Sequence, residues 1–112
     1  RRLGPARWTP TEGLYRPDEP YIPWRAKSRR GSAWLSTYRN GERIYDFSGL
    51  PMTVELLRSD DGRTYSPLRA TQPAVLQGGG SETDFEFDAR GDLYAVVRNE
   101  AGDASGFGSK IC

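Results

Sequence analysis

Residues 84–98, DFEFDARGDLYAVVR, predict a β-hairpin and indicate the fold class of the chain. Phe85 and Phe87 alternate with acidic residues at a period of two, which is typical of a strand with one buried face. A turn signal at residues 89–92 separates them from an apolar run over 93–98, which we expect to be a strand buried on both faces. Short runs of this kind, divided by turn residues, recur along the chain and predict an all-β protein.

Further strands are predicted on both sides of this hairpin. We expect strands over residues 21–27, 32–39, 52–58 and 64–68, a short extended piece at 43–47, a strand beginning at 109–112, and a proline-rich extended segment over 1–20. The run Gly78-Gly79-Gly80 predicts a flexible joint, and residues 102–108 predict a glycine-rich loop. No segment has a sustained apolar period of 3.6 residues, so little or no helix is expected.

The composition excludes several classes of function. The chain has 112 residues, with 16 Lys and Arg against 15 Asp and Glu, and a formal net charge of +1. This balance gives no reason to expect nucleic acid or an anionic membrane as a partner. No apolar run approaches the ~20 residues that a membrane-spanning helix needs. The chain has no histidine, which removes imidazole chemistry and histidine metal sites, and we expect no metal or cofactor.

The single cysteine, Cys112, cannot form a disulfide within the chain. The first residues lack the apolar core of a signal peptide. A mature secreted protein agrees with both observations, and the sequence does not determine the location.

Two parts of the sequence align at an offset of about 60 residues, and in each part a strand precedes the matched positions. Gly31, Trp34 and Arg39-Asn40 match Gly91, Tyr94 and Arg98-Asn99. Internal repetition is typical of propellers and solenoids, in which each unit needs neighbours to bury its faces.

The turn at residues 58–65, RSDDGRTY, resembles the Asp-box (BNR repeat) of sialidases, S-x-D-x-G-x-T-W. Asp60, Gly62 and Thr64 match, Tyr65 is a conservative aromatic change, and Arg58 departs from the pattern. We expect Asp60 to accept hydrogen bonds from the backbone of the turn, Gly62 to take a positive φ, and Tyr65 to pack into the sheet. The resemblance implies a β-propeller of antiparallel four-stranded blades, in which the box joins the third and fourth strands.

The resemblance also implies a division of the chain into three parts. Residues 1–20 are an extended N-terminal segment, residues 21–77 a first blade containing the turn at 58–65, and residues 78–112 a second, truncated blade. Because propellers have ~4–8 blades, the expected partners are further blades of the same protein or identical copies of this chain. A small β-sandwich or barrel with a chance Asp-box match is the alternative.

Carboxylates gather where the inner strands of such blades are expected to end. Glu82, Asp84 and Glu100 are the candidate catalytic residues, because glycoside hydrolysis uses one carboxyl as acid and another as nucleophile or base. The structural alternative is that these side chains are solvated or paired with arginines. Glu86 and Asp88 are expected on one solvated face.

Arg25, Arg98 and Trp24 are the candidate substrate-binding residues. A guanidinium group binds a substrate carboxylate through two hydrogen bonds, and an exposed tryptophan ring can stack on a sugar. For Trp24 the alternative is a position in the core. Ile22-Pro23 resembles part of the Arg-Ile-Pro motif of sialidases, with Tyr21 in place of the arginine.

Two functions follow from the resemblance, both with carbohydrate as the partner. The first is a fragment or subunit of a sialidase-like glycoside hydrolase. The second is a non-catalytic carbohydrate-binding or scaffold propeller.

Overall fold

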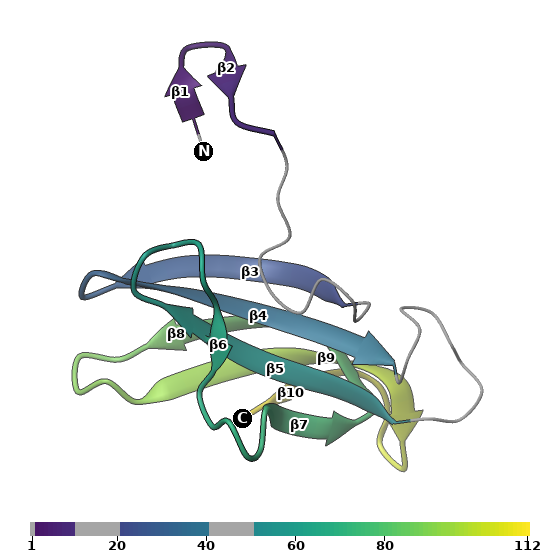
Figure 1. The fold of residues 1–112 in the computed structure, drawn as a ribbon. Coiled ribbons are helices and arrows are strands. Elements are labelled where there is room, and N and C mark those ends of the chain that lie inside the picture. Colours follow the sequence, from purple (N-terminus) through teal and green to yellow (C-terminus); the bar gives the residue numbers. More distant parts are fainter. Residues whose placement is uncertain (1, 11–20, 41–50) are drawn as a thin grey trace.

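The computed structural model describes residues 2–10, 21–40 and 51–112, and every regular element in them is a β-strand (Figure 1). The expected segments at 11–20 and 43–47 lie outside the described residues. The strands are β1 (Arg2–Gly4), β2 (Arg7–Trp8), β3 (Ile22–Arg29), β4 (Ser32–Asn40), β5 (Met52–Ser59), β6 (Ser66–Pro67), β7 (Ala74–Gly78), β8 (Gly80–Phe87), β9 (Leu93–Asp103) and β10 (Gly106–Ile111). All pairings are antiparallel, and β1 with β2 forms a small sheet of its own.

The largest sheet contains β3 to β7, in the order β3-β4-β5-β6, with β7 also paired to β5. β4 occupies one edge of β5 along its length, so β6 and β7 must share the other edge. β6 lies opposite Leu57 and Arg58, and β7 lies opposite residues 52–55. The sheet is therefore four strands wide, with an interrupted outer strand whose second piece, β7, was not predicted.

The third sheet contains β8, β9 and β10, with β9 in the centre. Its hairpin between β9 and β10 shows that the predicted loop at 102–108 was wrong, because β9 continues to Asp103 and β10 begins at Gly106. The predicted flexible joint was also wrong. The backbone oxygen of Gly79 accepts hydrogen bonds from Glu100 N (2.8 Å) and Ala101 N (3.2 Å), which ties the glycine run to β9.

Gly80 explains why this crossing between the sheets needs small residues. A Cβ atom at Gly80 would lie 2.7 Å from Leu76 and 2.8 Å from Val97. The glycine therefore allows close packing. A run of three glycines in a sequence can serve either flexibility or close packing, and the sequence alone does not separate the two.

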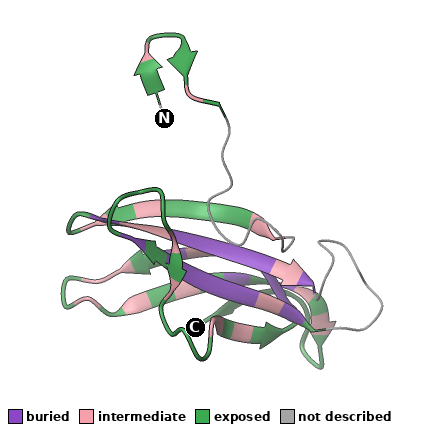
Figure 2. Ribbon diagram, viewed as in Figure 1, coloured by how far each residue is buried: buried purple, intermediate pink, exposed green. Residues whose placement is uncertain are grey.

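The two larger sheets form two layers (Figures 1 and 2), and apolar side chains of both layers pack together. Tyr38, Met52 and Val54 from one layer pack with Val97 from the other. Leu35 and Leu57 are opposite each other in register, and they form a second buried cluster with Tyr65. Because side chains alternate across a strand, this second cluster lies on the other face of the sheet of β3 to β7, away from β8 and β9.

The strand at 93–98 is buried on one face and not on two, contrary to the prediction. Val97 is 2% exposed, whereas Tyr94 is 50% and Val96 is 49% exposed. Tyr94 and Val96 lie on the outer face of the third sheet, and among the described residues no second layer covers that face. An apolar run alone does not show how many layers pack against a strand.

The turn between β5 and β6 has the expected glycine and aromatic contacts but a different acidic residue at its centre. Gly62 has φ +69°, and Tyr65 packs against the cluster of Leu35 and Leu57. Asp61 Oδ1, not Asp60, accepts the backbone N–H groups of residues 63 and 64, each at 2.7 Å.

Asp60 has another role, so the expectation for it was wrong. Its Oδ1 accepts hydrogen bonds from Ser32 Oγ (2.7 Å) and Arg58 Nη2 (2.8 Å), which joins the turn to the start of β4. Thr64, which matches the Asp-box, also donates its hydroxyl to Asp61 Oδ2 (3.2 Å). The turn is thus closed by the second of two adjacent aspartates.

Candidate functional site

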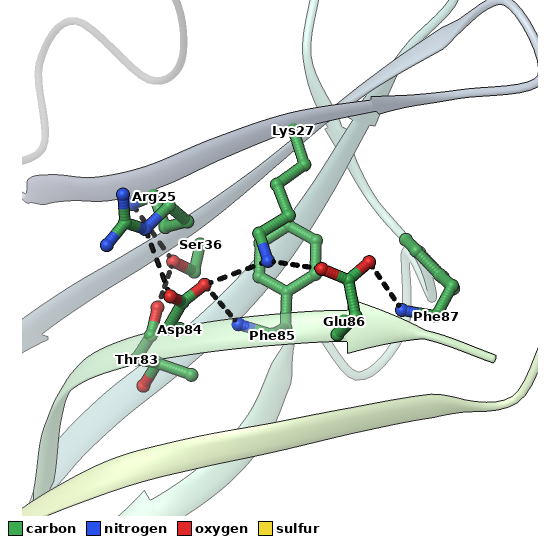
Figure 3. Close-up of polar contacts among 8 residues, drawn as sticks. All are labelled: Arg25, Lys27, Ser36, Thr83, Asp84, Phe85, Glu86 and Phe87. Carbon is green, nitrogen blue, oxygen red and sulfur yellow. Dashed lines mark hydrogen bonds and ion pairs between the residues drawn. The ribbon is translucent and has the colours of Figure 1, made fainter.

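Cations of β3 and carboxylates of β8 meet where the edges of the two layers lie side by side (Figure 3). Arg25 Nε lies 3.3 Å from Asp84 Oδ2. Lys27 Nζ lies 3.3 Å from Asp84 Oδ1 and 2.8 Å from Glu86 Oε2. These four side chains, which we call the edge cluster, join strands that are 59 residues apart in the sequence.

The carboxylates of the edge cluster also cover the free backbone groups of β8. Asp84 Oδ1 accepts the N–H of Phe85 at 2.7 Å, and Glu86 Oε1 accepts the N–H of Phe87 at 3.1 Å. These N–H groups point away from β9, because side-by-side residues of an antiparallel pair alternate between bonded and non-bonded positions. The carboxylates therefore occupy donors that would otherwise pair with another strand.

A buried serine completes this contact between the layers. Ser36 is 1% exposed, and its hydroxyl donates to the backbone oxygen of Thr83 at 2.6 Å. The same hydroxyl accepts the N–H of Arg25 at 3.2 Å, where the register between β3 and β4 shifts. One side chain thus satisfies backbone groups of both β3 and β8.

The charges of the edge cluster stabilise one another in their ionised forms. Burial raises the pKa of Asp84, but the N–H of Phe85 and the ammonium of Lys27 outweigh it and hold that pKa below its ordinary value. The hydrogen bond from Lys27, followed by the N–H of Phe87, lowers the pKa of Glu86. The hydrogen bond to Glu86 is the largest cause of the raised pKa of Lys27. Both carboxylates are consequently anionic at neutral pH.

The other predicted residues do not join the edge cluster. Glu82 forms a separate ion pair across the β8–β9 ladder, with its Oε2 3.2 Å from Arg98 Nη1. Among the described residues, no ion pair or side-chain hydrogen bond links the Glu100 carboxylate to either pair. Trp24 is 46% exposed and meets the ring of Tyr38 edge-on at 6.4 Å. The six candidate residues therefore form two ion pairs, Arg25 with Asp84 and Arg98 with Glu82, and leave Glu100 and Trp24 separate from both.

Asp88, which was expected on a solvated face, closes the turn between β8 and β9. Its Oδ1 accepts the backbone N–H groups of Arg90, Gly91 and Asp92 at 2.8–2.9 Å. Burial raises the pKa of Asp88, but these bonds outweigh it and lower that pKa overall.

An open groove of about 420 Å³ runs beside the edge cluster. Its lining combines charged groups with apolar side chains of the third sheet: Lys27, Asp84, Phe85, Glu86, Tyr94, Ala95, Val96 and Ile111. The half-exposed ring of Tyr94 lies opposite Glu86 in the register of β8 and β9. The sequence predicted Tyr94 to be buried, since its strand was expected to have two covered faces. Lys27 was not selected, because its contact with β8 depends on how the layers pack.

The described part of the chain offers no group of three or more His, Cys, Asp or Glu residues arranged to hold a metal ion. It also contains no helix long and apolar enough to cross a membrane.

Comparisons with protein-family models, with curated proteins and with solved structures gave no match to this chain.

Proposed function

We propose that this chain is a non-catalytic carbohydrate-binding unit whose sugar site is the groove beside Tyr94. The main observation in support is a half-exposed tyrosine ring in a groove that is also lined by Lys27 and Glu86. An aromatic ring offers an apolar face to the C–H groups of a sugar. Carboxylate and ammonium groups beside it can accept from and donate to sugar hydroxyls. The groove volume falls within the ~300–1,000 Å³ range of small-molecule sites.

The pairing of the carboxylates favours binding over hydrolysis. A glycosidase needs a carboxyl that keeps its proton until it transfers it to the leaving oxygen, and its pKa is raised for that purpose. The pKa of Asp84 is lowered, and Glu82 is held by Arg98. The glycoside hydrolase fragment is therefore the less supported of the two candidates.

We infer further that residues 21–77 correspond to one blade of a sialidase-like propeller and residues 78–112 to part of the next. The support is a sheet four strands wide in chain order, with the Asp-box-like turn between its third and fourth strands. The hairpins β3–β4 and β8–β9 also follow the sequence repeat, and both have a glycine of positive φ in the turn, Gly31 and Gly91.

A glycan array followed by titration of the best binder tests the sugar site. We expect Tyr94→Ala to weaken binding at least ~tenfold, which corresponds to about 1.4 kcal/mol. Tyr94→Phe should keep most of the affinity, because the ring face remains. Trp24→Ala is the matched control, since it removes another half-exposed aromatic ring outside the groove.

Two results would overturn the proposal. One is the absence of any glycan binder for the folded protein. The other is hydrolysis of an aryl glycoside that Asp84→Asn or Glu82→Gln abolishes, which would establish the glycosidase instead.

A further inference from the structure

In the part of the chain that the structure describes, no strand pairs with the outer edge of β10. Ala95 and Cys112 exchange both of their backbone hydrogen bonds, at 3.0 and 2.9 Å. Because bonding positions alternate along an antiparallel strand, Ser109 and Ile111 direct their N–H and C=O groups away from β9, and Phe107 precedes them at the register shift between Gly106 and Gly108. In the ranges that the structure describes, no side chain bonds to these groups.

The neighbouring edges are protected in ways that β10 is not. The carboxylates of Asp84 and Glu86 cover β8, and β3 carries Pro23 with a cation at every second position from Arg25. β10 is exposed along all six residues, and its single charged side chain, Lys110, is paired with Asp103. Unprotected edges of this kind are templates for the addition of another strand.

We propose that the β10 edge is the site at which a second copy of this chain pairs, antiparallel and about a two-fold axis at Ser109. In this register Phe107 lies opposite Ile111 of the second copy, and Ile111 lies opposite Phe107. Both side chains are about 80% exposed in the single chain (81% and 80%). Aromatic and β-branched side chains form favourable cross-strand pairs, and a two-fold interface requires such self-complementarity.

The charges agree with a second copy as the occupant. Lys110 lies opposite Gly108 of the other copy, so the two lysines do not face each other. The net charge of +1 gives little repulsion between copies. The pairing adds two backbone hydrogen bonds between the two Ser109 residues, and further ones where Ile111 of each copy meets Phe107 of the other. The proposal does not depend on the sugar site, and it is an alternative to the propeller inference, in which the next strand of the same blade would occupy this edge.

Sedimentation velocity of the 112-residue chain from ~10 µM to ~1 mM tests the pairing, because an edge contact is smaller than the ~1,600 Å² of a standard stable interface and should be weak. We expect a concentration-dependent dimer. Ser109→Pro removes the central N–H donor, which the chain itself does not use, and should weaken the dimer at least ~tenfold.

Phe107→Lys is the second variant. It changes only an exposed side chain, so we expect it to fold even if Ser109→Pro prevents folding. We expect it also to weaken the dimer at least ~tenfold, while Glu86→Lys on the β8 edge leaves it unchanged. A monomer at every concentration, or a dimer that neither Ser109→Pro nor Phe107→Lys weakens, would overturn the proposal.

Discussion

The two outer strands of the third sheet, β8 and β10, pair with the same central strand but have opposite environments. β8 places Phe85 between the layers, where it is 2% exposed, and receives a hydrogen bond from Ser36. β10 places Phe107 in solvent, where it is 81% exposed. The layers are thus joined by side chains along β8, whereas β10 is held by its ladder with β9.

This difference gives a physical role to residues that resemble a catalytic cluster. An edge strand is safe from unwanted pairing when charged side chains cover its backbone donors. Asp84 and Glu86 do this on β8 by bonding to the N–H of the next residue. Lys27 pairs with both carboxylates at the contact with the other layer, and Arg25 supplies a second positive charge beside Asp84. Carboxylates and cations at strand ends can therefore serve the sheet edge without any substrate.

The largest effect that separates the two edges should come from their phenylalanines. Phe85→Ala should lower the free energy of unfolding by roughly 3–5 kcal/mol, because it removes a buried ring and leaves a cavity. Phe107→Ala should change it by less than about 0.5 kcal/mol, because the ring is exposed. Urea denaturation of the two variants at a concentration where the protein is monomeric measures the difference. Equal losses would show that both edges contribute to the core.

The hydroxyl groups of the two edges give a smaller contrast. Ser36→Ala should lower the free energy of unfolding by about 1–3 kcal/mol, because it leaves the buried carbonyl oxygen of Thr83 without its donor. Ser109→Ala is the matched control on β10, and its exposed side chain should contribute less than about 0.5 kcal/mol. Denaturation under the same conditions compares them. If Ser36→Ala is as stable as the wild type, the serine does not hold β8 to the other layer.

The strands of the hairpins were predictable because their signals are local. Alternation at Phe85 and Phe87, and turn residues near Gly31 and Gly91, predicted the two hairpins, although β8 begins four residues earlier and β9 ends five residues later than expected. β7 was missed because it is short and pairs only with β5, which is distant in the sequence. The end of β10, residues 109–111, was predicted as a strand, but its first half was predicted as a loop because Gly106 and Gly108 are typical of turns and rare in strands.

The candidate site was predictable only in part. Asp84 and Arg25 were selected and do meet, but their partner Lys27 was not selected, because its contact with Glu86 spans 59 residues. The choice between Asp60 and its neighbour in the turn could not be made from the sequence, since two adjacent aspartates offer the same acceptor one residue apart. Contacts between layers and the register of a turn depend on packing that single-residue patterns do not contain.

The smallest expected difference between the edges is a dependence of stability on acid pH. The lowered pKa values of Asp84 and Glu86 favour the folded state above their ordinary values of 3.8 and 4.5, and this contribution is lost as the pH falls through the folded-state values. The double variant Asp84→Asn, Glu86→Gln keeps an oxygen for each N–H of β8 but removes the charges. We therefore expect the free energy of unfolding to fall less steeply from roughly pH 5 to pH 2 in the variant than in the wild type. Urea denaturation across this range measures both curves, with far-ultraviolet circular dichroism at pH 7 as the control for an intact fold. Parallel curves would mean that the charges on β8 do not favour the folded state, and its protection would then rest on the hydrogen bonds alone.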